Sequence, residues 1–394
     1  MESNYKANRR KGSRPLTLWN LSLMADIGLN IMWHNKLRLV ATLLGVIFAS
    51  ILANQSIGIM LALINKSAML IRNAKADIWI LPPATEFLVP GRYIATSSVL
   101  RARSSAEVAD AQPFLLAGGS IALPNGSSDG LTLVGTTAPA HIGGPWNVVA
   151  ATPNALAGDQ LILESADLVR FPGVTLGSTH EVNGQSITIS GLTWGAQQME
   201  APLAFGSFDL VRDLAKIPID KATAGLVVLR PGVDPATARA RLQQELPEAM
   251  VVTKAELDKV ITNTMLTKTP IGVVFGSLAA FGIAIGFVMV SLSVFSGVSE
   301  NLREFGTLRA IGARTGDLTI LMLIQACAYA TMGSVIGIGL VSAVALLIRS
   351  AALVVVIEPF MIWSTFAAMV LMCCSAALVS MVRIWRIEPG MVFR

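Results

Sequence analysis

Four long stretches of the chain are both strongly apolar and free of charged residues, and they limit the possible fold more than any other feature of the sequence. They cover residues 39–65, 269–299, 318–348 and 359–382. A helix of about 20 largely apolar residues crosses the ~30 Å hydrocarbon core of a bilayer. The sequence therefore predicts four transmembrane helices. Only 14% of the residues are charged, whereas soluble domains contain roughly 25%, so an ordinary soluble protein is excluded.

Basic residues are concentrated in three short segments outside the expected spans, at residues 1–38, 300–317 and 383–394. Together these segments contain 13 basic and 6 acidic residues, whereas residues 66–268 contain 16 basic and 18 acidic ones. Short cytoplasmic segments carry an excess of Lys and Arg. We therefore expect both termini and the loop 300–317 to be cytoplasmic. Residues 66–268 and the short loop 349–358 are expected on the opposite side.

Residues 66–268 are too many for a structureless loop and predict a large α+β domain between the first and second spans. Asn183-Gly184 is typical of a tight hairpin turn. The order expected after Gly225 is a strand at 226–229, a helix at 235–245, a strand at 250–253 and a helix at 254–268. We expect that last helix to continue into the second span, so that residues 254–299 form one stiff helix.

Three short patterns predict further starts of helices or strands in this domain. Ser104 with Glu107, and Thr253 with Glu256, have the spacing of a capping box and predict two helix starts. The segment Asp77-Ile-Trp-Ile-Leu81, ended by two prolines, predicts a strand.

The residues that carry catalysis or bind metals are sparse in this domain. His141 and His180 have no neighbour at ligand spacing, so we interpret both as structural. Ser165, Ser178 and Ser207 lie in no nucleophile-elbow sequence. We therefore expect no catalytic residue, no metal site and no directly bound cofactor. The basic residues are not interleaved with aromatic ones, which argues against a nucleic-acid partner.

The expected spans contain two motifs for helix packing. Gly282 with Gly286, and Gly333 with Gly337, form GxxxG patterns that allow helix backbones to approach closely in lipid. Asn54 and Gln55 are polar and should face another helix or an aqueous cleft. In the loop 300–317, apolar residues recur every third position and predict a short amphipathic helix. From physical chemistry alone, this helix could equally lie flat on the inner leaflet.

The segment 303–313, Arg-Glu-Phe-Gly-Thr-Leu-Arg-Ala-Ile-Gly-Ala, resembles the conserved loop of FtsX-like ABC transporter permeases, the type VII class that includes MacB and DevC. Residues 76–80 and 388–394 look most like the DevC branch. The resemblance covers about half of the chain: the membrane part and both edges of the domain between the first two spans.

This resemblance implies a homodimeric permease of the bacterial inner membrane with a periplasmic domain, working with a separate ABC ATPase. The protein would bind no cofactor itself and would use ATP through that partner. No phosphate-loop motif occurs in the sequence. DevC-like members also imply a periplasmic adaptor and an outer-membrane duct. The helix implied to dock on the ATPase comprises Glu304, Phe305, Gly306, Thr307, Leu308, Arg309, Ala310, Ile311, Gly312 and Ala313.

Two other functions stay open at this point. The protein could transmit force to regulate a cell-wall hydrolase in the periplasm without transporting anything. It could also be a membrane-anchored sensor that has no ATPase. The sequence does not distinguish a lipid, glycolipid, peptide or drug as the substrate.

Overall fold

A computed structural model describes residues 18–198, 201–300, 306–307, 315–347 and 359–385. The chain divides into two compact units. The membrane unit contains the described residues 18–58, 275–347 and 359–385. The extramembrane unit contains the described residues 59–274.

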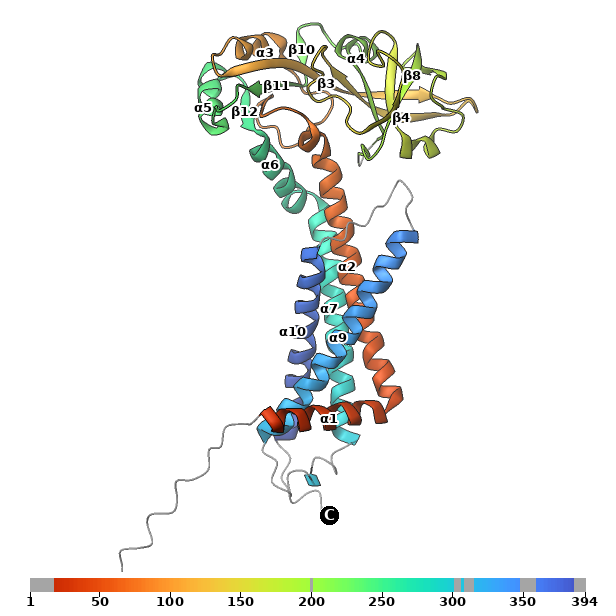
Figure 1. Cartoon of the computed structure of the whole chain (residues 1–394), viewed down its shortest axis with the longest axis vertical. Coiled ribbons are helices and arrows are strands. Elements are labelled where there is room, and N and C mark those ends of the chain that lie inside the picture. Colours follow the sequence, from red (N-terminus) through yellow and green to blue (C-terminus); the bar gives the residue numbers. More distant parts are fainter. Residues whose placement is uncertain (1–17, 199–200, 301–305, 308–314, 348–358, 386–394) are drawn as a thin grey trace, which may run out of the picture. The chain divides into compact units, whose positions relative to one another are not determined.

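Four long helices build the membrane unit, the first of them up to Gly58 and the second from Phe275, and each helix is long and apolar enough to cross a bilayer (Figure 1). They are α2 (Lys36–Asn73), α7 (Pro270–Glu300), α9 (Thr315–Leu347) and α10 (Pro359–Trp385). A large α+β domain separates the first of these helices from the other three. The predicted fold class is therefore confirmed.

A further helix, α1 (Leu18–His34), precedes the first long helix and was not predicted from the sequence. It packs against α9, where Gln325 Nε2 donates a hydrogen bond to the backbone oxygen of Gly28 over 2.8 Å. Met32 is buried together with Leu39 and Tyr329. Figure 1 shows α1 crossing the end of the helix bundle. The segment at residues 18–34 is therefore part of the folded membrane unit.

The extramembrane unit is built on a ten-stranded sheet of order β12-β1-β11-β3-β4-β9-β6-β8-β5, and β7 pairs with β3 and β8. A second sheet pairs β2 with β10. The strands are β1 (Ile78–Leu81), β2 (Ile94–Ala95), β3 (Val108–Ala122), β4 (Ser128–Thr136), β5 (Val148–Ala151), β6 (Gln160–Glu164), β7 (Thr179–Val182), β8 (Gln185–Thr193), β9 (Leu203–Ser207), β10 (Lys221–Ala222), β11 (Ala224–Leu229) and β12 (Met250–Thr253). The helices are α3 (Thr96–Arg103), the 3-10 helix η1 (Ser165–Arg170), α4 (Phe208–Leu214), α5 (Pro235–Glu245) and α6 (Lys254–Thr267).

The long strand β3 joins two lobes of this unit. Its first part, up to Phe114, pairs with β11, and its second part, from Leu115, pairs with β4. We call β12, β1, β11 and the first part of β3 the first lobe. The second part of β3 with β4 to β9 forms the second lobe. The two lobes are therefore connected through the backbone of β3, which hydrogen-bonds to β11 in the first lobe and to β4 in the second.

Strand β1 forms where the sequence predicts a strand, and all four of its residues are buried. Successive side chains of a strand point to opposite faces. Trp79 and Leu81 therefore enter one hydrophobic cluster, while Ile78 and Ile80 enter another with α3 and α5. The first lobe is thus a sheet with a hydrophobic layer on each side.

Most of the expected local elements are confirmed. The helix at Pro235–Glu245 and the strand at Met250–Thr253 have the predicted bounds. Thr253 and Glu256 form both hydrogen bonds of a capping box. Asn183 and Gly184 have φ values of 48° and 84°, and they connect β7 to β8, as a tight hairpin turn requires.

Two predictions were wrong. Ser104 does not begin a helix, since α3 ends at Arg103 and the Ser104 hydroxyl donates to the Arg101 backbone oxygen over 2.6 Å. Residues 254–299 are also not one helix, because α6 ends at Thr267 and α7 begins at Pro270. Proline cannot donate a backbone hydrogen bond and disfavours helical geometry at the residue before it. Pro270 therefore accounts for the break at residues 268–269.

Candidate functional site

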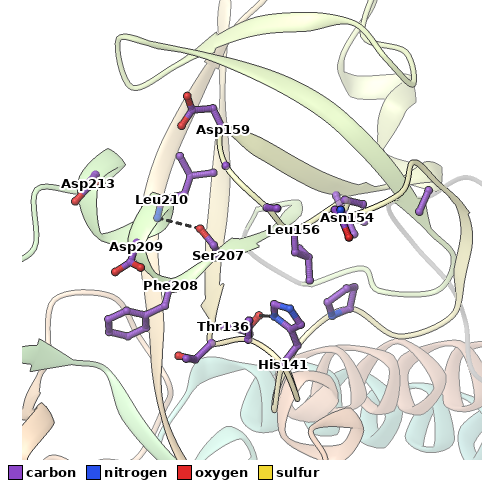
Figure 2. Close-up of a pocket in the computed structure, with 18 of the residues that line it drawn as sticks. Thr136, His141, Asn154, Leu156, Asp159, Ser207, Phe208, Asp209, Leu210 and Asp213 are labelled. Atoms are coloured by element: carbon purple, nitrogen blue, oxygen red, sulfur yellow. Dashed lines mark hydrogen bonds between the residues drawn. The ribbon is translucent and has the colours of Figure 1, made fainter.

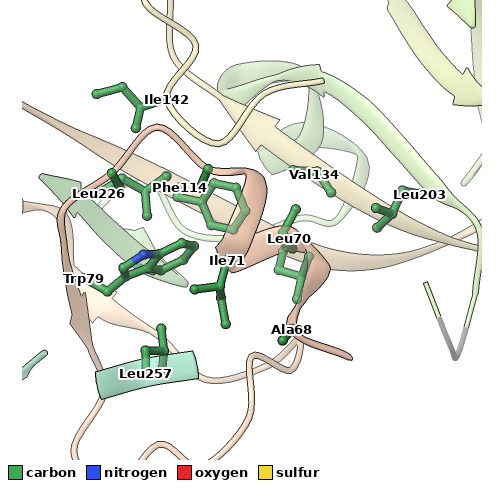
Figure 3. Close-up of a cluster of buried hydrophobic side chains, with 14 of the residues drawn as sticks. Ala68, Leu70, Ile71, Trp79, Phe114, Val134, Ile142, Leu203, Leu226 and Leu257 are labelled. Atoms are coloured by element: carbon green, nitrogen blue, oxygen red, sulfur yellow. The ribbon is translucent and has the colours of Figure 1, made fainter. Parts of the chain in front are cut away.

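The C-terminal end of α2 is buried in the core of the extramembrane unit. Ala68 and Ile71 have no exposed surface and pack with Trp79, Phe114 and Leu257 (Figure 3). Trp79 and Phe114 meet edge to face, with ring centroids 5.9 Å apart. Burying large apolar side chains of this kind contributes about 1.5–3 kcal/mol each. This end of α2 is therefore part of the domain and moves with it.

Polar contacts hold the same end of α2 against α6. Arg72 binds Asp258 with two nitrogens, at 2.5 and 3.3 Å. The Lys254 ammonium donates to the Ala74 backbone oxygen over 2.9 Å, next to the C-terminus of α2. A cation is favourable at that end because of the helix dipole. These contacts fix the C-terminal end of α2 to α6 within the extramembrane unit.

In the membrane unit, all four glycines of the GxxxG patterns lie against α2. A Cβ atom added at Gly282 would lie 2.8 Å from Leu52 Cβ, and one at Gly286 would lie 2.6 Å from Ala49 Cβ. A Cβ atom added at Gly333 would lie 2.5 Å from Val46 Cγ1, and one added at Gly337 would lie 2.7 Å from Ser50 Cβ. Real Cβ atoms do not approach this closely. The glycines therefore bring α7 and α9 close to α2 within one chain.

Asn54 is buried between two helices of the membrane unit. Its side-chain oxygen accepts a hydrogen bond from Thr365 of α10 over 3.1 Å, and its amide nitrogen donates to the Ser50 backbone oxygen over 2.8 Å. Both polar ends of the side chain therefore have partners, as a buried amide in lipid requires. The neighbouring Gln55 is exposed.

Most of the loop implied to dock on an ATPase lies outside the described residues. Glu304, Phe305 and residues 308–313 fall in this category. Gly306 and Thr307 are described and are helical. The loop follows directly on Glu300, the last residue of α7.

A cleft of about 860 Å³ opens in the extramembrane unit beside the N-terminus of α4 (Figure 2). His141 lines it and shares a hydrogen bond of 3.1 Å with Thr136. Burial lowers the pKa of His141. Asp209 and Asp213 are paired with Arg212 at 2.8 and 3.3 Å, and the Ser207 hydroxyl caps α4. Each of these polar groups therefore has a partner within the extramembrane unit.

A buried carboxylate pair lies in the second lobe. Glu164 has no exposed surface, and it accepts hydrogen bonds from the backbone nitrogens of Gly195 and Ala196 at 3.0 and 2.8 Å. Asp167 is 7% exposed and accepts a hydrogen bond from Gln197. Burial raises the pKa of Asp167 to about 6, and the negative charge of Glu164 adds to this shift. The positive charges of Arg170 and Lys66 oppose it.

Sequence reasoning missed this carboxylate pair and the helix α1. The residues that enclose the pair lie about 30 positions away in the sequence, so no local pattern points to them. Among the residues that the structure describes, no group of three His, Cys, Asp or Glu side chains is arranged to hold a metal ion.

Comparison with known families gives a match at the C-terminal part of the chain. Residues 276–389 match the model of the FtsX-like permease C-terminal family. This range contains most of α7, and also α9 and α10. Residues 276–389 form an FtsX-like permease domain.

One curated relative of this chain is a protein named as a probable syringafactin export ATP-binding/permease protein, from Pseudomonas syringae pv. tomato. It is 32% identical over 84 residues, which make up 21% of this chain and 13% of that protein. The chain thus spans only a small part of the length of this curated relative.

Two solved structures are similar to about half of the chain. The periplasmic region of MacB from Actinobacillus actinomycetemcomitans has 14% identity and a TM-score of 0.38, over 49% of this chain and 96% of that one. The extracellular domain of the ABC-type transporter YknZ from Gram-positive bacteria has 11% identity and a TM-score of 0.32, over 45% of this chain and 98% of that one.

The glycine contacts of the FtsX-like permease domain predict how it responds to added methyl groups. Gly333→Ala places a methyl group against Val46 and should destabilise the membrane unit by about 1–3 kcal/mol, because the packed helices must separate. Gly339→Ala is the matched control, since no atom lies within 4 Å of the added Cβ. Thermal stability in detergent, followed by size-exclusion chromatography, compares the two. Equal stability would contradict the close packing against α2.

The pKa of Asp167 predicts how the stability of the second lobe depends on pH. Its folded pKa is about 6, above the ordinary value of 3.8. Between these pH values the folded state binds more protons than the unfolded chain, so stability falls as pH rises from about 4 to 6. In Asp167→Asn, the change in the free energy of unfolding between about pH 4 and 6 should be smaller by about 1–2 kcal/mol.

Hydrogen exchange of β6 and η1 in the full chain measures this effect. Exposed Asp220→Asn is the control and should keep the dependence of the wild type. An unchanged pH dependence in Asp167→Asn would show that Asp167 titrates normally.

Proposed function

We propose that this protein is the permease subunit of an ABC transporter, with a periplasmic extramembrane unit and cytoplasmic termini. The observation that carries the proposal is the match of residues 276–389 to the FtsX-like permease family. The four long apolar helices and the charge balance of the sequence support the membrane topology. The curated relative, whose name includes both an ATP-binding and a permease function, supports a link to an ATPase.

ATP hydrolysis on a separate ATPase would drive the extramembrane unit through helices. Helix α2 is the element best suited to this, because its 38 residues run from the membrane unit into the hydrophobic core of the extramembrane unit. A continuous helix of that kind resists bending, since each turn is held by backbone hydrogen bonds. The protein itself would bind no nucleotide and would use ATP only through its partner.

We further propose that the working unit is a homodimer in a bacterial inner membrane and that it drives export. A DevC-like branch, with a periplasmic adaptor and an outer-membrane duct, is the specific form we favour. Its support is the sequence pattern at residues 76–80 and 388–394. The syringafactin exporter among the relatives also favours export.

Charge reversal in the loop tests the link to the ATPase. We expect Glu304→Lys and Arg309→Glu each to weaken ATPase binding about tenfold, the effect of losing about 1.4 kcal/mol of contact energy. ATP hydrolysis and transport should then become uncoupled. Co-purification and transport into membrane vesicles measure both effects.

Glu245→Lys is the control, because Glu245 is exposed on α5, far in sequence from the loop. If the loop variants couple normally, the assigned role of the loop is wrong. If wild-type vesicles accumulate no substrate and a cell-wall hydrolase is recovered with the complex, the protein transmits force without transport.

A further inference from the structure

Glu300, the last residue of α7, is held by polar side chains at the point where the loop begins. Its carboxylate accepts hydrogen bonds from Asn35 over 3.3 Å and from Ser296 over 2.9 Å. Arg38 lies 3.8 Å from the same carboxylate oxygen that Asn35 contacts. Asn35 and Arg38 are about 265 residues earlier in the chain. The contacts therefore join the end of α7 to the start of α2.

Asn35 has a second role in this cluster. It is the single residue between α1 and α2. Its side-chain oxygen accepts a hydrogen bond from the Arg38 backbone nitrogen over 3.4 Å, as an N-cap residue does. The side chain that fixes the first turn of α2 is thus also the one that contacts Glu300.

Arg38 does not extend into solvent as a residue that only anchors a span would do. Its side chain is 15% exposed. It lies on Gly297, where an added Cβ atom would be 2.9 Å from Arg38 Cζ and 3.4 Å from Cδ. A largely buried guanidinium is costly unless it is paired. The glycine makes room for Arg38 beside Glu300, which supplies the opposite charge.

These contacts lie at one end of a line of close contacts between α2 and α7, which we call the seam and which involves residues 42–52 of α2 and 282–293 of α7. Along it, the Thr42 hydroxyl hydrogen-bonds the Ser293 hydroxyl. A Cβ added at Gly45 would lie 2.8 Å from Met289 Cβ. The seam continues through the contacts of Gly286 and Gly282 with α2. The two helices therefore have little room to slide past each other.

We propose that Asn35, Arg38 and Glu300 form a polar clamp that passes a displacement of the loop 300–317 to the start of α2. This rests on the proposed function, because the displacement would come from the ATPase. The three are positioning residues and need not touch the ATPase. Loss of the ion pair leaves the Arg38 guanidinium without its opposite charge and costs some stability, but the seam should keep the two helices assembled. Loss of the clamp should therefore impair transmission in a protein that still folds.

The test uses the full chain co-purified with its ATPase in lipid nanodiscs. Hydrogen exchange is measured at residues 59–74, the far end of α2, with and without ATP plus vanadate. In the wild type we expect an ATP-dependent change. In Glu300→Gln and in Arg38→Gln that change should fall about fivefold, within the usual range of coupling between sites. The amount of bound ATPase should stay the same.

Rescue and control variants separate transmission from structure. The double variant Arg38→Glu with Glu300→Arg restores opposite charges and should recover part of the response. Asn35→Ala keeps the ion pair and should give an intermediate response. Arg103→Gln is the matched control, because it removes an ion pair of the extramembrane unit, with Asp110 at 3.3 Å. Its response should equal that of the wild type.

Failure of the clamp proposal and failure of the proposed function would give different results. If the wild type binds no ATPase or shows no ATP-dependent change, the proposed function is wrong. If the wild type responds and both Gln variants respond equally well, the clamp is wrong. If the Gln variants lose thermal stability and do not assemble, and Asn35→Ala assembles with a full response, the residues are structural and the proposal is overturned.

Discussion

The burial of the end of α2 under Trp79 and Phe114 is the interaction on which the rest of this structure depends. A helix long enough to cross a bilayer would ordinarily end in solvent or in a loop. Here its last turns supply Ala68 and Ile71 to the same cluster that contains β1 of the first lobe. Removing that end would expose a large apolar surface of the sheet. The helix that precedes the extramembrane unit in the chain therefore completes the hydrophobic core of that unit.

The membrane unit uses small residues and satisfied polar groups in place of a hydrophobic driving force. Lipid tails are as apolar as leucine, so helices associate through close packing and hydrogen bonds. The glycines of α7 and α9 bring both helices against α2, and Asn54 links α2 to α10. Helix α2 is thus the central element of the bundle as well as an element of the extramembrane core.

Local sequence signals predicted the parts of the fold whose cause is local. The helix at Pro235–Glu245 could be placed because Asp234 caps it and proline begins it. The four spans follow from the absence of charge. Ser104 misled because capping-box spacing occurs by chance, and the helix nearby ends where the spacing predicts a start. The break before Pro270 was overlooked because an apolar run does not reveal whether a helix is continuous.

The candidate site was less predictable, since its contacts join residues that are far apart in the chain. The four packing glycines could be listed from their spacing, but their common partner α2 could not. In the sequence, Glu300 and Arg38 are each a charged residue next to a predicted span, and nothing indicates that they contact each other. Only the fold shows that Gly297 leaves space for Arg38. The pKa shift of Asp167 likewise depends on its burial next to Glu164, and no sequence pattern encodes that burial.

The strand β3 has a consequence for how such proteins can be recombined. Because Val108–Ala122 supplies a paired strand to both lobes, neither lobe is a separable module. A chimera that exchanges only the second lobe between two relatives would have to be joined within this strand. The first part of the strand would then come from one protein and the second part from the other, so the strand pairing of both lobes would depend on the junction.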